Sequence, residues 1–237
     1  MSTIWETVTW NVARAGGFTS YILLTLAVAV GLALSTQLQS PSRWPRLLNS
    51  ELHNFLTLLS SIFIIVHVLA VWIDPFTRFG WNEVFIPFVS TYRTVWMALG
   101  IVGLYLGIAI GISTWLRPHI GYKWWRRLHV LTLGIYALAT LHGIGTGSDT
   151  QTWWAFAIYA VSIVLVGSLL WRRIVETKNK NKKKAHVAAA AQRAARPAQR
   201  SNASYPANPR TMNSAAANEI APARTQAHYQ RDAARVR

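Results

Sequence analysis

Apolar residues dominate the first three quarters of the chain and fall into long uninterrupted segments. Five segments of 19 to 23 residues contain no Asp, Glu, Lys or Arg: 17–36, 52–73, 94–116, 128–147 and 153–171. A helix of about 20 apolar residues is long enough to cross the roughly 30 Å of hydrocarbon in a bilayer. The pattern therefore predicts an all-α integral membrane bundle of five transmembrane helices joined by short loops.

Tryptophan marks the ends of these segments. The chain has 12 Trp, and nine of them lie at or near a predicted boundary: Trp72, Trp81, Trp96, Trp115, Trp124, Trp125, Trp153, Trp154 and Trp171. Tryptophan is enriched at membrane–water interfaces, where its amphipathic ring lies at the level of the headgroups. We predict that these residues form the interfacial belt of the bundle.

The composition changes after residue 176. Residues 1–176 carry 11 basic and 6 acidic residues, whereas residues 177–237 carry 13 basic and 2 acidic residues. The second segment has no apolar periodicity and too little apolar surface to fold alone, so we predict a disordered, basic, Ala/Arg-rich tail with a transient helix within 184–196. Its lysine cluster is predicted to bind the anionic surface of the lipid bilayer rather than nucleic acid.

The charges of the connecting regions predict an orientation. Lys and Arg concentrate in the first, third and last of these regions, at Arg43, Arg46, Arg117, Lys123, Arg126, Arg127, Arg172 and Arg173. Short loops rich in Lys and Arg stay in the cytoplasm. We therefore expect the N-terminus outside and the tail in the cytoplasm, in the inner (plasma) membrane of a bacterium.

Four of the seven histidines lie inside apolar segments. His53 and His67 are in the second segment, and His129 and His142 are in the fourth. An ionisable side chain inside a membrane is costly and is by default a functional candidate. A lone histidine is more often hydrogen-bonded to a neighbouring helix, but two pairs at similar spacings indicate shared ligands. The chain has no cysteine, which excludes thiolate sites, iron–sulfur clusters and disulfides.

The spacing of these histidines suggests what they bind. His53 and His67 are 14 residues apart, a separation that rises by about 21 Å and returns within roughly 40° of the same helix face. Both helices run in the same direction, so His53 can face His129 at one level and His67 can face His142 at another. Two opposed imidazoles are the axial ligands of a haem iron, which predicts an inner and an outer haem b. Zinc fits less well, because each pair supplies two ligands only.

One spacing does not fit a regular helix. His129 and His142 are 13 residues apart, which turns the second ring roughly 140° away from the first on an ideal helix. Either the fourth helix is irregular, or the two cofactors present different edges to it. Gly134 lies between the two histidines and GIGTG follows the second, so the helix can deform or end here.

Three stretches carry a resemblance to a known family: RAGGFTSYILL at 14–24, ELHNFLTLLSSIFIIVHVL at 51–69 and WRRLHVLTLGIYALATLH at 125–142. With them the chain resembles the ferric reductase-like transmembrane domain family. That family includes the membrane halves of ferric reductases and NADPH oxidases, and the haem-binding subunit of the periplasmic methionine sulfoxide reductase system. The resemblance covers about residues 10–172 and implies axial roles for the four histidines. Many relatives have six helices, whereas five are predicted here.

Basic residues near the inner pair have two interpretations. They can bind haem propionates through charge-assisted hydrogen bonds, or they can be ordinary cytoplasmic loop cations. The candidates are Arg46, Lys123, Arg126 and Arg127. Arg127 is the strongest because it lies two residues before His129. Arg14 and Arg93 are weaker outer equivalents, and Tyr136 is better explained by packing than by electron transfer.

We therefore assign residues 1–176 to a haem-binding transmembrane domain and residues 177–237 to the tail. The predicted function is transmembrane electron transfer, as the membrane subunit of an oxidoreductase without its own flavin or nicotinamide domain. The expected donor is a quinol or a separate reductase. Expected acceptors are ferric iron, oxygen, or a partner flavoprotein or molybdoenzyme within a larger membrane complex. The alternative is a non-catalytic subunit that anchors or organises such a complex.

Overall fold

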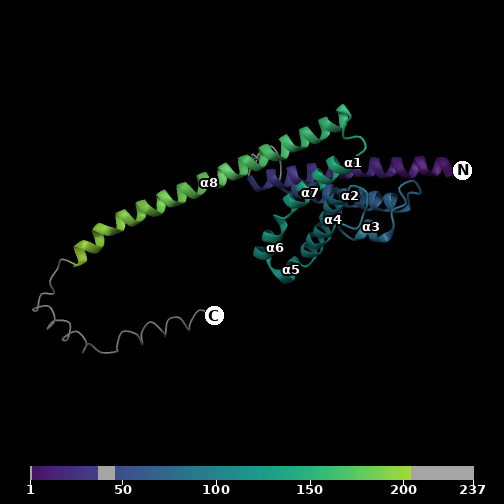
Figure 1. The fold of residues 1–237 in the computed structure, drawn as a ribbon. Coiled ribbons are helices and arrows are strands. Elements are labelled where there is room, and N and C mark those ends of the chain that lie inside the picture. Colours follow the sequence, from purple (N-terminus) through teal and green to yellow (C-terminus); the bar gives the residue numbers. More distant parts are fainter. Residues whose placement is uncertain (1, 37–45, 204–237) are drawn as a thin grey trace, which may run out of the picture. The chain divides into compact units, whose positions relative to one another are not determined.

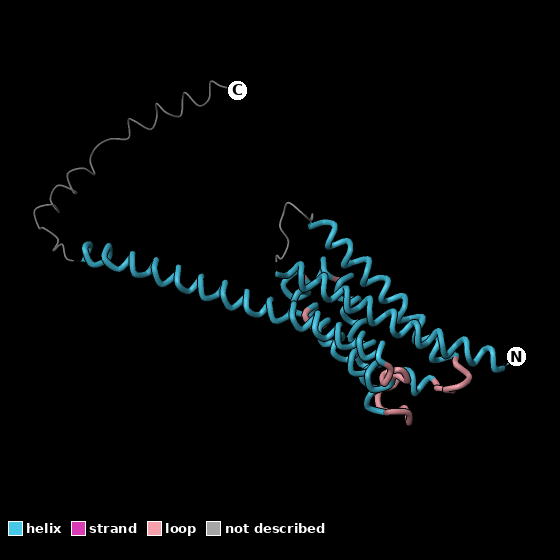
Figure 2. Tube along the Cα trace, turned by 90° about the horizontal axis from the view of Figure 1, so that it is seen from above, coloured by secondary structure: helices cyan, strands magenta, loops and turns pink. Residues whose placement is uncertain are grey.

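A computed structural model describes residues 2–36 and 46–203 of the chain (Figure 1). The helices in these ranges are α1 (Ser2–Thr36), α2 (Arg46–Ile73), α3 (Trp81–Phe85), α4 (Thr94–Trp115), α5 (Arg117–Ile120), α6 (Tyr122–His129), α7 (Thr132–Thr146) and α8 (Trp153–Ala203). No strand occurs in the two described ranges, where loops alone connect the helices (Figure 2).

Within the described residues, five helical segments are long and apolar enough to cross a membrane: Thr7–Thr36, Ser50–Ile73, Thr94–Trp115, Tyr122–Thr146 and Trp153–Arg193. They contain or closely match the five predicted segments, so the all-α class and the five spans are confirmed. Many of their large apolar side chains are exposed, among them Phe55, Leu58, Ile65, Val95, Ile108, Val161 and Val164. An extended apolar surface on helices of this length is what contact with lipid requires. The chain is an integral membrane protein.

α1 contacts α7 and α8 through aromatic side chains. The ring of Tyr21 on α1 lies 6.1 Å from that of Tyr136 on α7 and 5.1 Å from that of Tyr159 on α8, measured between centroids. Phe18, one turn earlier, packs on Trp154 of α8 at 4.8 Å. These aromatic contacts form the apolar core of the bundle, and they fix α7 and α8 against α1.

α1 and α2 pack side by side in antiparallel orientation. Ser60 of α2 donates a hydrogen bond to the carbonyl of Ser20 at 3.1 Å. Directly after α2, the carboxylate of Asp74 accepts hydrogen bonds from the Thr9 hydroxyl at 2.6 Å and the Thr77 N–H at 2.9 Å. The Asp74 side chain is only 2% exposed. Because a buried carboxylate requires such donors, Asp74 fixes the end of α2 to the beginning of α1.

α4 and α7 form a second antiparallel pair, in which glycines allow close approach. A Cβ added at Gly103 would lie 3.5 Å from the Cβ of Leu138, and one added at Gly145 would overlap the indole ring of Trp96. Small residues at helix contacts let membrane helices approach closely. The end of α7 therefore depends on glycine at position 145.

The fourth transmembrane span is interrupted. α6 ends at His129 and α7 begins at Thr132. The N–H of Leu131 bonds to the carbonyl of Leu128 at 2.9 Å, and that of Leu133 bonds to the carbonyl of Val130 at 3.1 Å, both three residues back. Such bonds wind the backbone more tightly than an α-helix. Of the two explanations for the 13-residue spacing, the irregular helix is the one observed.

A boundary between two units of the chain falls after Lys178, within α8. α8 is helical to Ala203, beyond the predicted beginning of the tail at residue 177, and every described side chain from 177 to 193 is exposed. Ala, Lys, Arg and Gln have high helix propensities, so a helix can form here without packing. The predicted transient helix within 184–196 lies inside α8, whereas residues 204–237 of the predicted disordered tail lie outside the described residues.

Candidate functional site: two facing histidine pairs

The four intramembrane histidines form two facing pairs. The ring centroids of His53 on α2 and His129 on α6 are 6.1 Å apart, and the ring planes are inclined by 74°. Those of His67 on α2 and His142 on α7 are 6.4 Å apart, and their planes are inclined by 77°. We call these the 53–129 pair and the 67–142 pair. The pairing is the one that the spacing predicts, while the role of the rings as ligands stays a prediction.

Three of the four rings contact a backbone carbonyl of a neighbouring helix. The distances from Nδ1 to the carbonyl oxygen are 2.9 Å for His53 with Ala27, 2.7 Å for His67 with Ala13, and 2.8 Å for His142 with Trp96. A carbonyl oxygen can only accept, so Nδ1 carries the proton and Nε2 has a free lone pair in each of these rings. Histidines that bind metal ions in proteins are held in this way.

Glycines leave room for the same three rings. An added Cβ would lie 3.2 Å from His53 Cε1 at Gly31, 3.1 Å from His67 Nδ1 at Gly17, and 2.5 Å from His142 Nδ1 at Gly100. The contact at Gly100 is shorter than Cβ atoms make in real structures. Because the ring of His142 is also fixed by the Trp96 carbonyl, α4 can hold it in this position only with glycine at 100.

His129 is held differently. Its Nδ1 is buried and has no hydrogen-bond partner in the part of the chain that the structure describes. The ring stacks on Trp125, with centroids 4.9 Å apart and planes inclined by 26°. The sequence predicts Trp125 only as part of the interfacial belt, whereas the structure also places it against a candidate ligand. Arg117 lies over the face of the same indole at 4.5 Å.

The separation of the rings in each pair matches that of two imidazoles that share one metal ion. Two metal–nitrogen bonds of about 2 Å, together with the ring radii, place opposed imidazole centroids about 6.3 Å apart. The observed distances of 6.1 and 6.4 Å match this value. Among residues 2–36 and 46–203, no group of three or more His, Cys, Asp or Glu could share a metal ion. The dimensions fit two axial ligands of a haem iron better than a tetrahedral site.

Three of the four basic residues predicted to bind propionates lie on the helix that carries His129. Lys123, Arg126 and Arg127 are exposed on α6, the helix that ends at His129. The two arginines contact aromatic side chains of their own helix. Arg46 is the first residue of α2, and its side chain lies outside what the structure describes. Propionate binding by these four residues stays a prediction.

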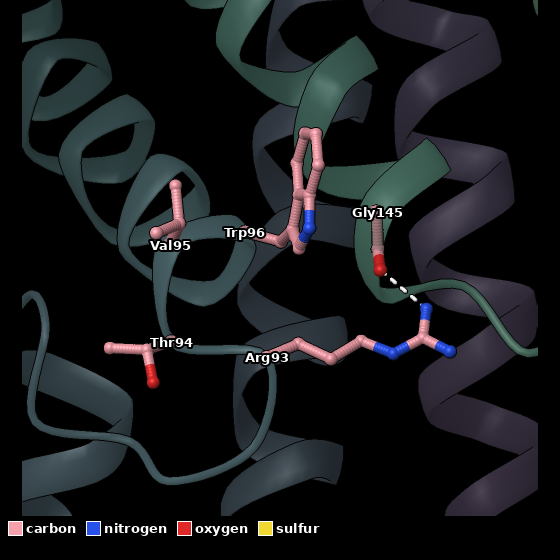
Figure 3. Close-up of a pocket in the computed structure, with 5 residues that line it drawn as sticks. All are labelled: Arg93, Thr94, Val95, Trp96 and Gly145. Carbon is pink, nitrogen blue, oxygen red and sulfur yellow. Dashed lines mark hydrogen bonds between the residues drawn. The ribbon is translucent and has the colours of Figure 1, made fainter.

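The two arginines near the 67–142 pair have protein partners. Arg14 makes two hydrogen bonds to the carboxylate of Asp149, one of them from Nε at 2.8 Å. Arg93 has a left-handed backbone conformation, with φ of 44°, and donates to the carbonyl of Gly145 (Figure 3). Arg93 and Gly145 line a small cavity together with Trp96, whose own carbonyl contacts His142. These contacts tie neighbouring segments together and argue against a propionate role for either arginine.

Tyr136 lies between the two pairs in sequence and is buried. Its hydroxyl is 3.5 Å from that of Tyr21, which also accepts a hydrogen bond from Thr140 at 3.2 Å. A buried hydroxyl needs such partners. The contacts favour the packing interpretation of Tyr136.

An apolar helical bundle with two facing histidine pairs defines a class: integral membrane proteins with paired intramembrane imidazoles. The chain belongs to the family described as ferric reductase like transmembrane component, which it matches over residues 16–140. The match includes His53, His67 and His129 and ends two residues before His142. No curated protein and no solved structure matches the chain. The family confirms the resemblance and indicates transmembrane electron transfer in general.

Proposed function

We propose that the chain passes single electrons across the bilayer through two haem b groups, one held by each histidine pair. The observation that carries this proposal is the facing geometry of the rings, with centroids 6.1 and 6.4 Å apart. The carbonyl contacts support it, because they leave Nε2 of three rings free for iron. The family supports it too, since transmembrane domains of this kind commonly bind haem.

Haem supplies reversible one-electron chemistry when it is bound. The four histidines would ligate it, and the carbonyl contacts of three of them would orient the ligating rings. His53 and His67 lie on one helix, and fourteen residues separate them by about 21 Å along its axis. Their carbonyl partners on α1 fix both rings before the cofactor binds, so ligation requires little rearrangement. Two sites in line on one helix allow electrons to cross without any moving part of the protein.

We propose that cations at one end of the bundle neutralise the propionates of the haem at the 53–129 pair. Lys123, Arg126 and Arg127 are exposed on α6, and none of them is in an ion pair within the described residues. Arg46 at the beginning of α2 belongs to the same group on sequence grounds. Arginine and lysine bind carboxylates through charge-assisted hydrogen bonds, which are stronger than neutral ones.

The loop charges support an orientation for the two sites. Cytoplasmic loops are enriched in Lys and Arg, so we infer that the 53–129 site is the inner one and the 67–142 site the outer one. The proposed location is the plasma membrane of a bacterium. A quinol or a separate reductase would donate electrons on one face, and a partner protein would accept them on the other.

The proposal predicts two haems b per chain with low-spin spectra, because each iron has histidine on both faces. A pyridine haemochrome titration against protein concentration measures the ratio, and the visible spectra of oxidised and reduced protein report the spin state. A ratio near one haem per chain would mean that only one of the two histidine pairs binds haem. A colourless preparation would contradict the proposal and leave the organising subunit as the better explanation.

A further inference from the structure

Three of the four histidine contacts repeat one local pattern. Each ring packs on a helical turn that offers a carbonyl and has glycine four residues later: Ala13 with Gly17, Ala27 with Gly31, and Trp96 with Gly100. On α1 the two turns are 14 residues apart, the spacing of His53 and His67. α1 therefore presents one such turn to each of the two histidines of α2.

α4 has this turn beside His142 but lacks it beside His129. Fourteen residues after Trp96 and Gly100 are Ile110 and Thr114. The carbonyl of Ile110 already accepts hydrogen bonds from the hydroxyls of Ser113 at 2.8 Å and Thr114 at 2.9 Å. Thr114 also has a Cβ where the other three turns have glycine. The fourth turn thus offers neither a free carbonyl nor the space for a ring.

This turn lies beside His129. The indole N–H of Trp125 donates to the Thr114 hydroxyl at 3.2 Å, and the ring of Trp125 stacks on His129. The Nδ1 of His129 is buried and has no partner among the residues that the structure describes. The two sites therefore differ: the outer pair has two rings bonded to carbonyls, and the inner pair has one.

We propose that the inner, 53–129 site has the higher reduction potential, because Ser113 and Thr114 prevent His129 from donating a hydrogen bond to a carbonyl. The inference rests on the proposed function, since it concerns how the same two sites hold an electron. A hydrogen bond from Nδ1–H to a carbonyl makes an imidazole more basic. A more basic ligand stabilises the oxidised, more positive iron. The outer site, with two such ligands, is therefore harder to reduce, and the first electron occupies the inner site.

Fixed charges act in the same direction. The helix that ends at His129 carries Lys123, Arg126 and Arg127. Nearby positive charge stabilises the reduced iron, which has one positive charge fewer than the oxidised iron, and so raises the reduction potential. At the outer site Arg14 is neutralised by Asp149. Ser113 and Thr114 act on potential through His129, so they are positioning residues.

A redox titration of the purified holoprotein, followed by the visible band of reduced haem, tests the order of the sites. We expect two one-electron steps in the wild type, a higher step at the more positive potential and a lower step at the more negative potential. His53→Ala removes the inner haem and should keep the lower step, whereas His67→Ala removes the outer haem and should keep the higher step. If His53→Ala keeps the higher step instead, the inference is wrong.

A second pair of variants tests the cause. Ser113→Ala/Thr114→Gly rebuilds on α4 the turn found at the other three rings, and should lower the higher step while the lower step stays in place. Loss of such a partner typically changes metal affinity or activity about 10- to 100-fold. We expect about a tenfold change in the redox equilibrium of the inner haem, which corresponds to about 59 mV for one electron. The matched control, Ser113→Ala/Thr114→Ser, removes one of the two hydroxyls but keeps a hydroxyl on the Ile110 carbonyl and the Cβ at 114. It should lower the higher step far less than the rebuilt turn does.

The outcomes separate this inference from the proposed function. Protein without haem contradicts the function itself. Protein with two haems whose steps are reversed, or whose higher step responds equally to the rebuilt turn and to the control, contradicts only the inference. If the rebuilt turn prevents haem binding at the inner site, the steps that remain in His53→Ala and His67→Ala still show which site has the higher reduction potential.

Discussion

Gly100→Ala is expected to remove the outer haem and leave the inner one. The added Cβ would lie 2.5 Å from Nδ1, 2.7 Å from Cε1 and 2.9 Å from Cγ of His142. The ring cannot move away without losing its hydrogen bond to the Trp96 carbonyl. Forced overpacking of this kind typically costs about 1–3 kcal/mol, and here the displaced group is itself the ligand. Haem content per chain should fall from two to one.

Gly111→Ala is the matched control on the same helix. A Cβ at Gly111 would meet nothing within 4 Å, so this variant should keep both haems. Alanine is a better helix former than glycine by about 1 kcal/mol, so the control should be no less stable than the wild type. Two haems with unchanged potentials in Gly100→Ala would show that the ring of His142 is not held as the structure has it.

Single histidine variants should remove the haems one at a time. His67→Ala should lose the outer haem only and His53→Ala the inner haem only, because each leaves its iron with one axial imidazole. The double variant should be colourless. His119 on α5 is exposed and belongs to neither pair, so His119→Ala should bind two haems and serves as the control. Loss of both haems in either single variant would mean that the sites do not form independently.

The sequence predicts the fold and the pairing of the histidines because both follow from regular geometry. Uncharged segments of membrane length predict the spans, and a spacing of 14 residues repeats on one helix face. The irregularity between α6 and α7 follows from the 13-residue spacing only as one of two alternatives. It depends on the local backbone at Val130 and Leu131, where hydrogen bonds reach back three residues.

Other features of the site depend on contacts between distant segments. Arg14 and Asp149 are 135 residues apart, and no local pattern pairs them. The sequence places Trp125 in the interfacial belt, because composition alone does not say which face of a short helix meets His129. The turns that hold the rings did leave a signal: Ala13 with Gly17 and Ala27 with Gly31 repeat at the spacing of His53 and His67. That match is visible only once α1 is known to pack against α2.

Electron transfer across a sealed bilayer shows whether the two haems form a path through the membrane. The protein is reconstituted into lipid vesicles that contain trapped ferricyanide, and dithionite is added outside as the reductant. We predict that the trapped ferricyanide bleaches in vesicles with wild-type protein. Bleaching should be lost in vesicles with His67→Ala, which keeps one haem. The result does not depend on orientation, because both redox reagents act from fixed sides. Ferricyanide that bleaches no faster than in protein-free vesicles, while both haems are reduced, would rule out electron transfer across the bilayer through the two haems.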